Sequence, residues 1–256
     1  MKLEYSTLIS PYPLYLDKIG NVKSPTLKEI WNPSITYPRY NLYLKLLMMT
    51  PQVYHEQAEL VSANLQNDMG REENLNMFDL IAYNQDLQES YTDMFEFFFV
   101  EHVIWNSEYQ LFLLYQDVDE NGQIIPVGTI QKNIFTELCD VILQRCGINR
   151  SDADTDSSQV KSKKALEILK KIQKGKKNLA KNAKYDKDME LPNLIASVAV
   201  KSNSINFTNI WDLTVFQLYE QFKREQTNVY FDIQKMSVAA YGNSKDTFKG
   251  NEWYKL

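Results

Sequence analysis

Residues 117–122, with the sequence Asp-Val-Asp-Glu-Asn-Gly, match the first six positions of an EF-hand calcium loop. Such a loop needs a bidentate glutamate at position 12, but that position is Gly128 here, and position 9 is Ile125. Asp and Asn followed by Gly also suit a hairpin turn, because they tolerate positive φ. The pattern therefore favours a turn over a calcium site, and we expect no metal or other cofactor.

The two histidines, His55 and His102, stand in no catalytic motif. Neither belongs to a zinc-binding helical pair, and the chain has no Gly-x-Ser-x-Gly nucleophile motif. Gly175 lies among lysines but lacks the first glycine and the preceding strand of a phosphate-binding loop. We therefore expect no enzymatic activity. The alternative is a site assembled only by the fold, with a pocket that joins His55 or His102 to carboxylates.

The most unusual charge pattern is a lysine-rich run at residues 161–187. It holds eleven lysines against Glu167 and Asp186, a local net charge of +9 in a chain whose total is −5. Three interpretations are open: a solvated basic face, docking onto an acidic protein, and contact with nucleic acid. Phosphate binding would favour arginine and interleaved aromatics, whereas the run has no arginine and only Tyr185. The candidate basic surface residues are Lys170, Lys171, Lys176 and Lys177.

Aromatic residues near the C-terminus form a second candidate site. The clearest amphipathic helix predicted for the chain carries Phe207, Trp211, Val215, Leu218 and Phe222, at spacings of 4, 4, 3 and 4. Asn209 is expected to cap it, and Gly242 is expected to end the helical segment after it. Such a stripe is either core or a partner surface. The candidate partner contacts are Trp211, Phe216, Tyr219 and Phe222.

The chain has 256 residues, of which 44% are hydrophobic and 24% charged, so it can bury a sizeable core. No window holds the roughly 20 apolar residues needed to span a bilayer. The cysteines Cys139 and Cys146 are expected to be small buried residues. These features predict a cytoplasmic protein.

The hydrophobic pattern predicts an α+β fold, predominantly α-helical, with a small β-hairpin or sheet element in the N-terminal half. Two short strands are expected around a turn at Gly20 and Asn21, and a hairpin is expected around the turn at residues 117–122. Gly147 is expected to end a helix that carries both cysteines. Helices are predicted at residues 37–49, 53–64, 77–83, 87–100 and 193–200.

Composition divides the chain into three parts. Residues 1–148 form an N-terminal helical domain with the small β element, and residues 191–256 form a C-terminal helical region. Residues 149–190 lie between them as an acidic linker followed by a lysine-rich helical connector.

Four segments are similar to proteins of tailed bacteriophages and of prophages in Gram-positive bacteria. They are SPYPLYLDKIGNVKSPTLKEIW at residues 10–31, TYPRYNLYLKLLMM at 36–49, LPNLIASVAVKSNSINFTNIWDLTVFQLYEQFKREQ at 191–226 and the closing WYKL. The chain resembles tail assembly chaperone-like proteins over most of its length, and least in the acidic linker and the lysine-rich run. The shared motifs are not a catalytic signature.

The resemblance implies a non-enzymatic, mostly helical protein of the bacterial host cytoplasm that coats the apolar tape measure protein and keeps it soluble. The major tail protein, which polymerises around the tape measure, is a further expected partner, whereas membrane and nucleic acid are not. Many chaperones of this class are shorter than this chain. That departure leaves a structural tail or head-tail protein of the same phage module as an alternative, beside a nucleic-acid or packaging-associated binder that uses residues 161–187. The sequence also leaves open whether the chain forms a homo-oligomer.

Overall fold

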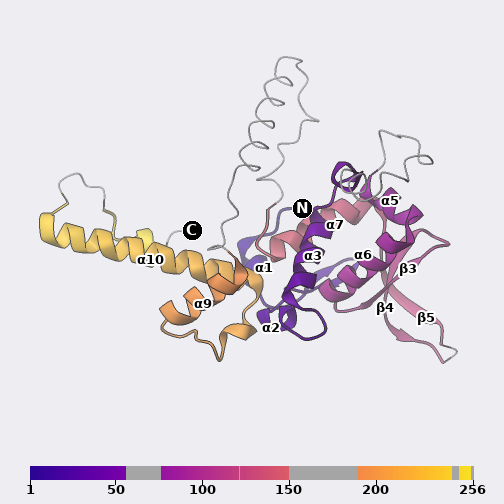
Figure 1. The fold of residues 1–256 in the computed structure, drawn as a ribbon, viewed down its shortest axis with the longest axis horizontal. Helices are drawn as coiled ribbons and strands as arrows, with labels where there is room; N and C mark the ends of the chain where they lie inside the picture. Colours follow the sequence, from indigo (N-terminus) through magenta and orange to yellow (C-terminus); the bar gives the residue numbers. More distant parts are fainter. Residues whose placement is uncertain (56–75, 121, 150–189, 244–247, 255–256) are drawn as a thin grey trace, which may run out of the picture. The chain divides into compact units, whose positions relative to one another are not determined.

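The computed structural model describes residues 1–55, 76–120, 122–149, 190–243 and 248–254. The chain divides into two compact units (Figure 1). The first comprises residues 1–150 with 214–216, and the second comprises residues 151–213 and 217–256. The predicted fold class is confirmed: helices dominate, and two small antiparallel sheets lie in the N-terminal half.

Helices of the first unit bury one face, and polar caps stabilise several of their starts. In α5 (Met77–Tyr83), the Asn76 side chain accepts a hydrogen bond from the Asp79 N–H at 3.0 Å. The carboxylate of Asp79 in turn accepts from the Asn76 N–H at 3.2 Å, which completes a capping box. The remaining helices of this unit are α1 (Tyr5–Ile9), α2 (Leu27–Ile30), α3 (Tyr37–Met48), α6 (Gln85–Phe98) and α7 (Lys132–Arg145).

The larger sheet has the antiparallel order β3-β4-β5. Its strands are β3 (His102–Asn106), β4 (Leu111–Val118) and β5 (Ile124–Ile130). The hairpin β4–β5 confirms the predicted turn, in which Gly122 has φ +77° and the Asp119 carboxylate accepts the Gln123 N–H at 2.7 Å. Asp119 thus closes a turn, in agreement with the interpretation of residues 117–122 as a turn.

An aromatic cluster joins this sheet to helices α5, α6 and α7. Phe112 of β4 lies 5.1 Å from Phe95 of α6 and 6.2 Å from Phe78 of α5, measured between ring centroids. Phe135 of α7 contacts Phe78 at 5.3 Å. These rings are buried and mostly meet edge to face, the favourable geometry for aromatic pairs. The core of the first unit is therefore built around them.

The smaller sheet pairs β1 (Leu14–Leu16) with β2 (Gly20–Val22), and here the predicted turn was wrong. Gly20 and Asn21 belong to β2 itself, and the chain turns at residues 17–19, where Lys18 has φ +60°. Asn21 is held in extended backbone because its C=O accepts the Val100 N–H at 3.0 Å. A contact with a segment distant in sequence therefore decided the position of the turn.

The second unit contains α9 (Leu191–Lys201), the short 3-10 helices η4 (Ile210–Asp212) and η5 (Glu252–Tyr254), and most of α10 (Val215–Tyr241). The predicted helix through Phe207 and Trp211 was wrong in its start, because α10 begins only at Val215. Asn209 makes no side-chain cap. The chain is extended before α10, where Thr214, itself part of the first unit, pairs with Thr26. Gly242, with φ +75°, ends α10 as predicted.

Candidate functional site

The distal half of α10 exposes an unusual amount of apolar surface. From Asn228 to Tyr241, only Phe231 and Val238 are half-buried, and every other side chain is exposed. The exposed fractions are 40% for Val229, 72% for Tyr230, 55% for Ile233, 64% for Met236 and 86% for Tyr241. Contiguous exposed apolar surface of this kind marks interaction sites.

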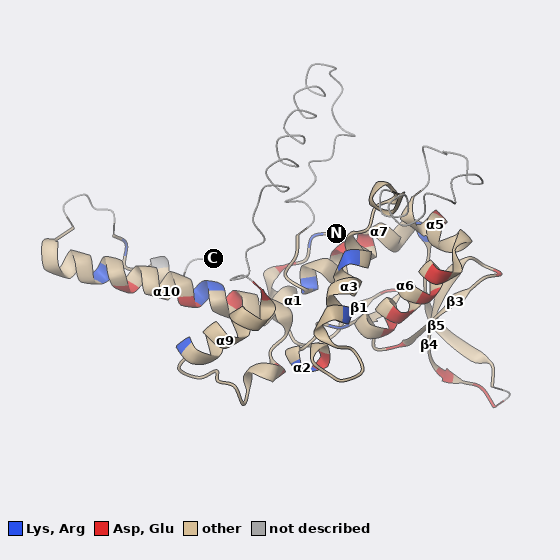
Figure 2. Cartoon of the chain, in the orientation of Figure 1, with Lys and Arg blue, Asp and Glu red and all other residues tan. Residues whose placement is uncertain are grey.

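Four of these positions follow one side of the helix. Val229, Ile233, Met236 and Ala240 are spaced 4, 3 and 4 apart, so they share one face, which we call the distal stripe. Beyond Glu225, Asp232 and Lys235 are the only acidic or basic residues in α10 (Figure 2). The stripe is thus apolar and locally neutral.

On the opposite face, α10 is contacted by the segment at residues 248–254, which we call the returning segment. Phe231 and Val238 are seven residues apart on this face, and the Phe231 ring lies 5.3 Å from the ring of Phe248. The Asn243 side chain accepts the Phe248 N–H and donates to the Phe248 C=O, both at 3.3 Å. The returning segment therefore contacts α10 at Phe231, opposite the distal stripe, and its Trp253 lines a pocket together with Val229 of the stripe.

The four predicted partner contacts lie nearer the start of α10 and are half-buried. The indole N–H of Trp211 donates to the Phe207 C=O at 2.9 Å. Phe216 meets Tyr5 edge to face, with ring centroids 6.2 Å apart. Tyr219 and Phe222 complete the set. The exposed apolar area lies farther along the same helix. The sequence could have indicated it through the 4-3-4 spacing of the distal stripe.

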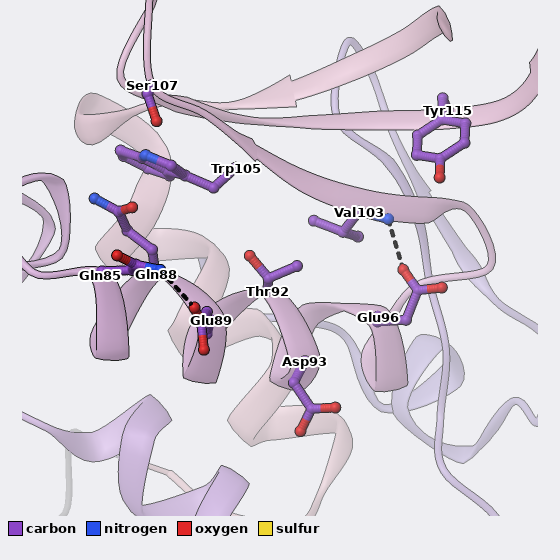
Figure 3. Close-up of a pocket in the computed structure, with 10 residues that line it drawn as sticks. All are labelled: Gln85, Gln88, Glu89, Thr92, Asp93, Glu96, Val103, Trp105, Ser107 and Tyr115. Atoms are coloured by element: carbon purple, nitrogen blue, oxygen red, sulfur yellow. Dashed lines mark hydrogen bonds between the residues drawn. The ribbon is translucent and has the colours of Figure 1, made fainter. Parts of the chain in front are cut away.

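A groove of about 680 Å³ lies between the exposed side of α6 and strands β3 and β4 (Figure 3). Glu89, Asp93 and Glu96 line it from α6, at spacings of 4 and 3 that place them on one helix face. Trp105 and Tyr115 line it from the sheet. Its acidic side, seen along α6 in Figure 2, disfavours phosphate-containing ligands.

The carboxylates of this groove are engaged in structural hydrogen bonds. Glu96 accepts from the Val103 N–H at 2.6 Å, which joins α6 to β3 (Figure 3), and pairs with His102 Nδ1 at 2.6 Å. Asp93 forms an ion pair with Arg39 at 2.6 Å.

The Tyr43 hydroxyl adds a further donor to Asp93, at 2.6 Å. Burial, together with this hydrogen bond, raises the pKa of Tyr43, so its phenol stays a donor at neutral pH. Asp93 therefore serves to join α3 to α6.

Sequence reasoning missed this groove because one of its walls is formed by β3, a strand that the sequence did not predict. The two histidines have different surroundings. His102 is exposed, contacts the groove residue Glu96 and lies 5.4 Å from the Tyr115 ring. His55 is exposed beside Tyr54. Among the described residues, no group of three or more His, Cys, Asp and Glu side chains could hold a metal ion.

Both cysteines lie within the core of the first unit, in α7 and at its C-terminal end. Cys139 and Cys146 are buried thiols, as predicted. Burial raises the pKa of Cys146 to about 12, so it stays protonated at neutral pH. The candidate basic residues Lys170, Lys171, Lys176 and Lys177 lie outside the described residues, as does most of the predicted helix at residues 53–64.

Comparison with known protein families adds one finding. The family described as the YomV second domain matches residues 180–256. That family is associated with phages and prophages of Bacillus, so the match supports a phage origin. The YomV-like segment (residues 180–256) includes α9, the distal stripe and the returning segment.

No curated protein and no solved structure matches the chain. No helix in the described ranges is long and apolar enough to cross a membrane.

Proposed function

We propose that this protein is a non-enzymatic phage tail assembly chaperone that binds the tape measure protein along α10. The observation that carries the proposal is the distal stripe, an exposed apolar face within the YomV-like segment. An apolar helix of the tape measure protein would be shielded from water by packing against such a face. Proteins that recognise helices use apolar anchors at i, i+3, i+4 and i+7. The resemblance of four sequence segments to tail assembly chaperone-like proteins supports the same role.

The proposed contact surface has two parts. The distal stripe provides exposed aliphatic anchors, and the half-buried aromatics Trp211, Phe216, Tyr219 and Phe222 would extend the contact toward the start of α10. Burying one aliphatic side chain of this size contributes about 1.5–3 kcal/mol. A few such anchors can therefore hold an apolar helix in solution without any catalytic group.

The test is co-expression with the tape measure protein encoded in the same phage or prophage genome. We expect the native chain to keep the tape measure protein in the soluble fraction, and the double variant Ile233→Asp, Met236→Asp to leave it insoluble. The double variant Asn228→Asp, Gln234→Asp adds the same two charges outside the stripe and is the matched control. Equal tape measure solubility with the native chain and the double variant of the stripe would reject the stripe as the binding surface.

The charge of residues 161–187 favours one further candidate, a nucleic-acid or packaging-associated binder. Binding through these lysines should weaken steeply with salt, since each phosphate contact releases counterions. Reversing the charge of Lys170, Lys171, Lys176 and Lys177 should abolish it. Binding that is absent or independent of salt would count against this candidate.

A further inference from the structure

The distal half of α10 is a helix with little support from its own chain. Residues 228–241 are helical, yet only Phe231 and Val238 are half-buried there. As the continuation of a longer helix, this half needs no new nucleus, but most helical stability in proteins comes from packing of an apolar face. Val229, Tyr230 and Ile233 also have lower helix propensity than alanine or leucine. A partner helix against the exposed face would supply the missing stabilisation.

The spacing of the exposed face identifies the geometry of that partner. Phe222, Gln226, Val229, Ile233, Met236 and Ala240 alternate at intervals of 4 and 3 residues. This is the heptad repeat of a coiled coil, in which the seam residues occupy positions a and d. The 27-residue helix is about 40 Å long, enough to present this seam without interruption.

Numbering the heptad with Ile233 at position a explains the two faces of the helix. Phe231 and Val238 then occupy position f, the position farthest from the seam. Phe231 and Val238 are the half-buried residues of this part of α10, and the ring of Phe231 packs against that of Phe248. The seam residues Gln226, Ile233, Met236 and Ala240 are exposed, whereas Val229 borders a pocket that Trp253 of the returning segment also lines.

We infer that the distal stripe pairs with the same stripe of a second copy of this chain, in a parallel two-stranded coiled coil. An identical helix has the same 3.5-residue period, so the two seams stay in contact along their length. Gln226 at position a would set the register, as single polar residues do at such positions.

The flanking residues favour a parallel pair. Position g of one helix then faces position e of the other, five residues on. This places Glu225 opposite Tyr230 and Asp232 opposite Ser237, a carboxylate against a hydroxyl donor in each case. In an antiparallel pair, position g faces position g, and Asp232 would meet the Asp232 of the second copy. Asp232 is exposed at the edge of a pocket of about 340 Å³, which Trp253 also lines.

The exposed area lies at the lower limit for a specific dimer. Tyr230, at 72% exposed, alone offers about 150 Å². With Val229, Ile233 and Met236 at 40%, 55% and 64% exposed, the face offers on the order of 500 Å² per copy. Complete burial of this face in two copies would remove at most about 1,000 Å², which is the lower limit for a specific interface.

Sedimentation equilibrium of the purified full-length chain tests the inference. We expect the native chain and the Gln234→Asp control to be dimers at tens of micromolar concentration, and Ile233→Asp to be a monomer with reduced helical circular dichroism. Thermal unfolding of the first unit, followed by near-ultraviolet circular dichroism, should be unchanged, which separates loss of the interface from misfolding. A monomeric native chain, or a dimer that Ile233→Asp leaves intact, would overturn the inference.

Cysteine cross-linking tests the orientation. A parallel dimer brings position 226 of both copies together, so Gln226→Cys should form an intermolecular disulfide under mild oxidation, while Gln234→Cys, off the seam, should not. No cross-link at position 226 in a variant that remains dimeric would reject the parallel arrangement. The thiols of Cys139 and Cys146 do not interfere, because both are buried.

The dimer does not rest on the chaperone role. A second copy and the tape measure helix would compete for the same stripe, and the two proposals can fail separately. If Ile233→Asp abolishes the dimer but not tape measure solubility, the dimer stands and the stripe is not the chaperone surface. If the native chain is monomeric and the double variant of the stripe releases the tape measure protein, the proposed function stands and the dimer is rejected.

Discussion

Glu101 holds Asn21 at two points, although the two residues are eighty positions apart in the chain. Its carboxylate accepts the Asn21 backbone N–H at 2.9 Å and the Asn21 side-chain amide at 2.6 Å. Glu101 is only 3% exposed. This carboxylate therefore ties the β1–β2 hairpin to the segment that enters β3.

Replacing Glu101 tests that connection. We expect Glu101→Ala to lower the free energy of unfolding by about 2–4 kcal/mol, because it leaves two donors without their acceptor in a buried site. Glu101→Gln keeps one acceptor oxygen and should cost less, about 1–2 kcal/mol. Urea unfolding measures both. The exposed residue Glu108 is the control, and Glu108→Ala should change stability by less than about 0.5 kcal/mol.

Gly128 is the point at which β5 meets the β1–β2 turn. A Cβ at this position would lie 2.1 Å from the backbone oxygen of Ile19, and the neighbouring Thr129 N–H donates to the Lys18 C=O at 3.0 Å. Gly128→Ala must push two backbones apart, so we expect it to destabilise the fold by about 2 kcal/mol or more. Gly250→Ala, where the added methyl meets open space, should be neutral in the same unfolding experiment. Equal stability of the two variants would contradict the close approach.

Arg145 anchors the N-terminal segment to the end of α7. It is 1% exposed, and its guanidinium donates to the C=O groups of Thr7 at 3.0 Å and Tyr12 at 2.6 Å. Burial lowers its pKa. Arg145→Met keeps much of the volume but leaves these carbonyls without a donor, which should cost about 2–4 kcal/mol. Hydrogen exchange should also speed up in residues 3–9, whereas the exposed control Lys45→Met should change neither.

The raised pKa of Cys146 predicts a loss of stability at high pH. Between pH 9 and about 12, the unfolded chain releases this proton while the folded chain keeps it. Stability therefore falls as pH rises through this window, by up to about 1.4 kcal/mol per pH unit from this group, and the contribution is complete below pH 9.

Cys146→Ala lacks this titration. The stability advantage of the native chain over the variant should therefore shrink between pH 8 and pH 10.5 in urea unfolding. Other groups titrate in both proteins and cancel in the difference. A difference that stays constant with pH would show that burial of the thiol does not shift its titration.

Local patterns in the sequence were sufficient for much of the secondary structure. The spacing of Tyr40, Tyr43, Leu44 and Leu47 predicted α3, and these side chains are buried except for Leu44, which is half-buried. Gly147 and Gly242 were correctly predicted to end helices, and each adopts positive φ there. These elements could be predicted because their stabilising contacts repeat within a few residues of the chain.

Two wrong predictions of secondary structure and one missed strand share a different cause. The position of the first turn, the start of α10 and the existence of β3 all depend on pairing with distant segments. Val100 binds Asn21, Thr214 pairs with Thr26, and His102 pairs with Tyr115 across the sheet. A strand exists only where a partner supplies its hydrogen bonds, so the short run before Asn106 could not be distinguished from the end of α6.

The sequence alone determined that this protein would be mainly helical with a β-hairpin, and that aromatic and apolar residues would gather on its C-terminal helix. Only the tertiary structure decided which of them meet solvent. Phe216 packs on Tyr5 and Phe231 on Phe248, while Ile233 and Met236 stay exposed. Helical spacing places residues on a common face, but the segments that return across the chain determine which face is left for a partner.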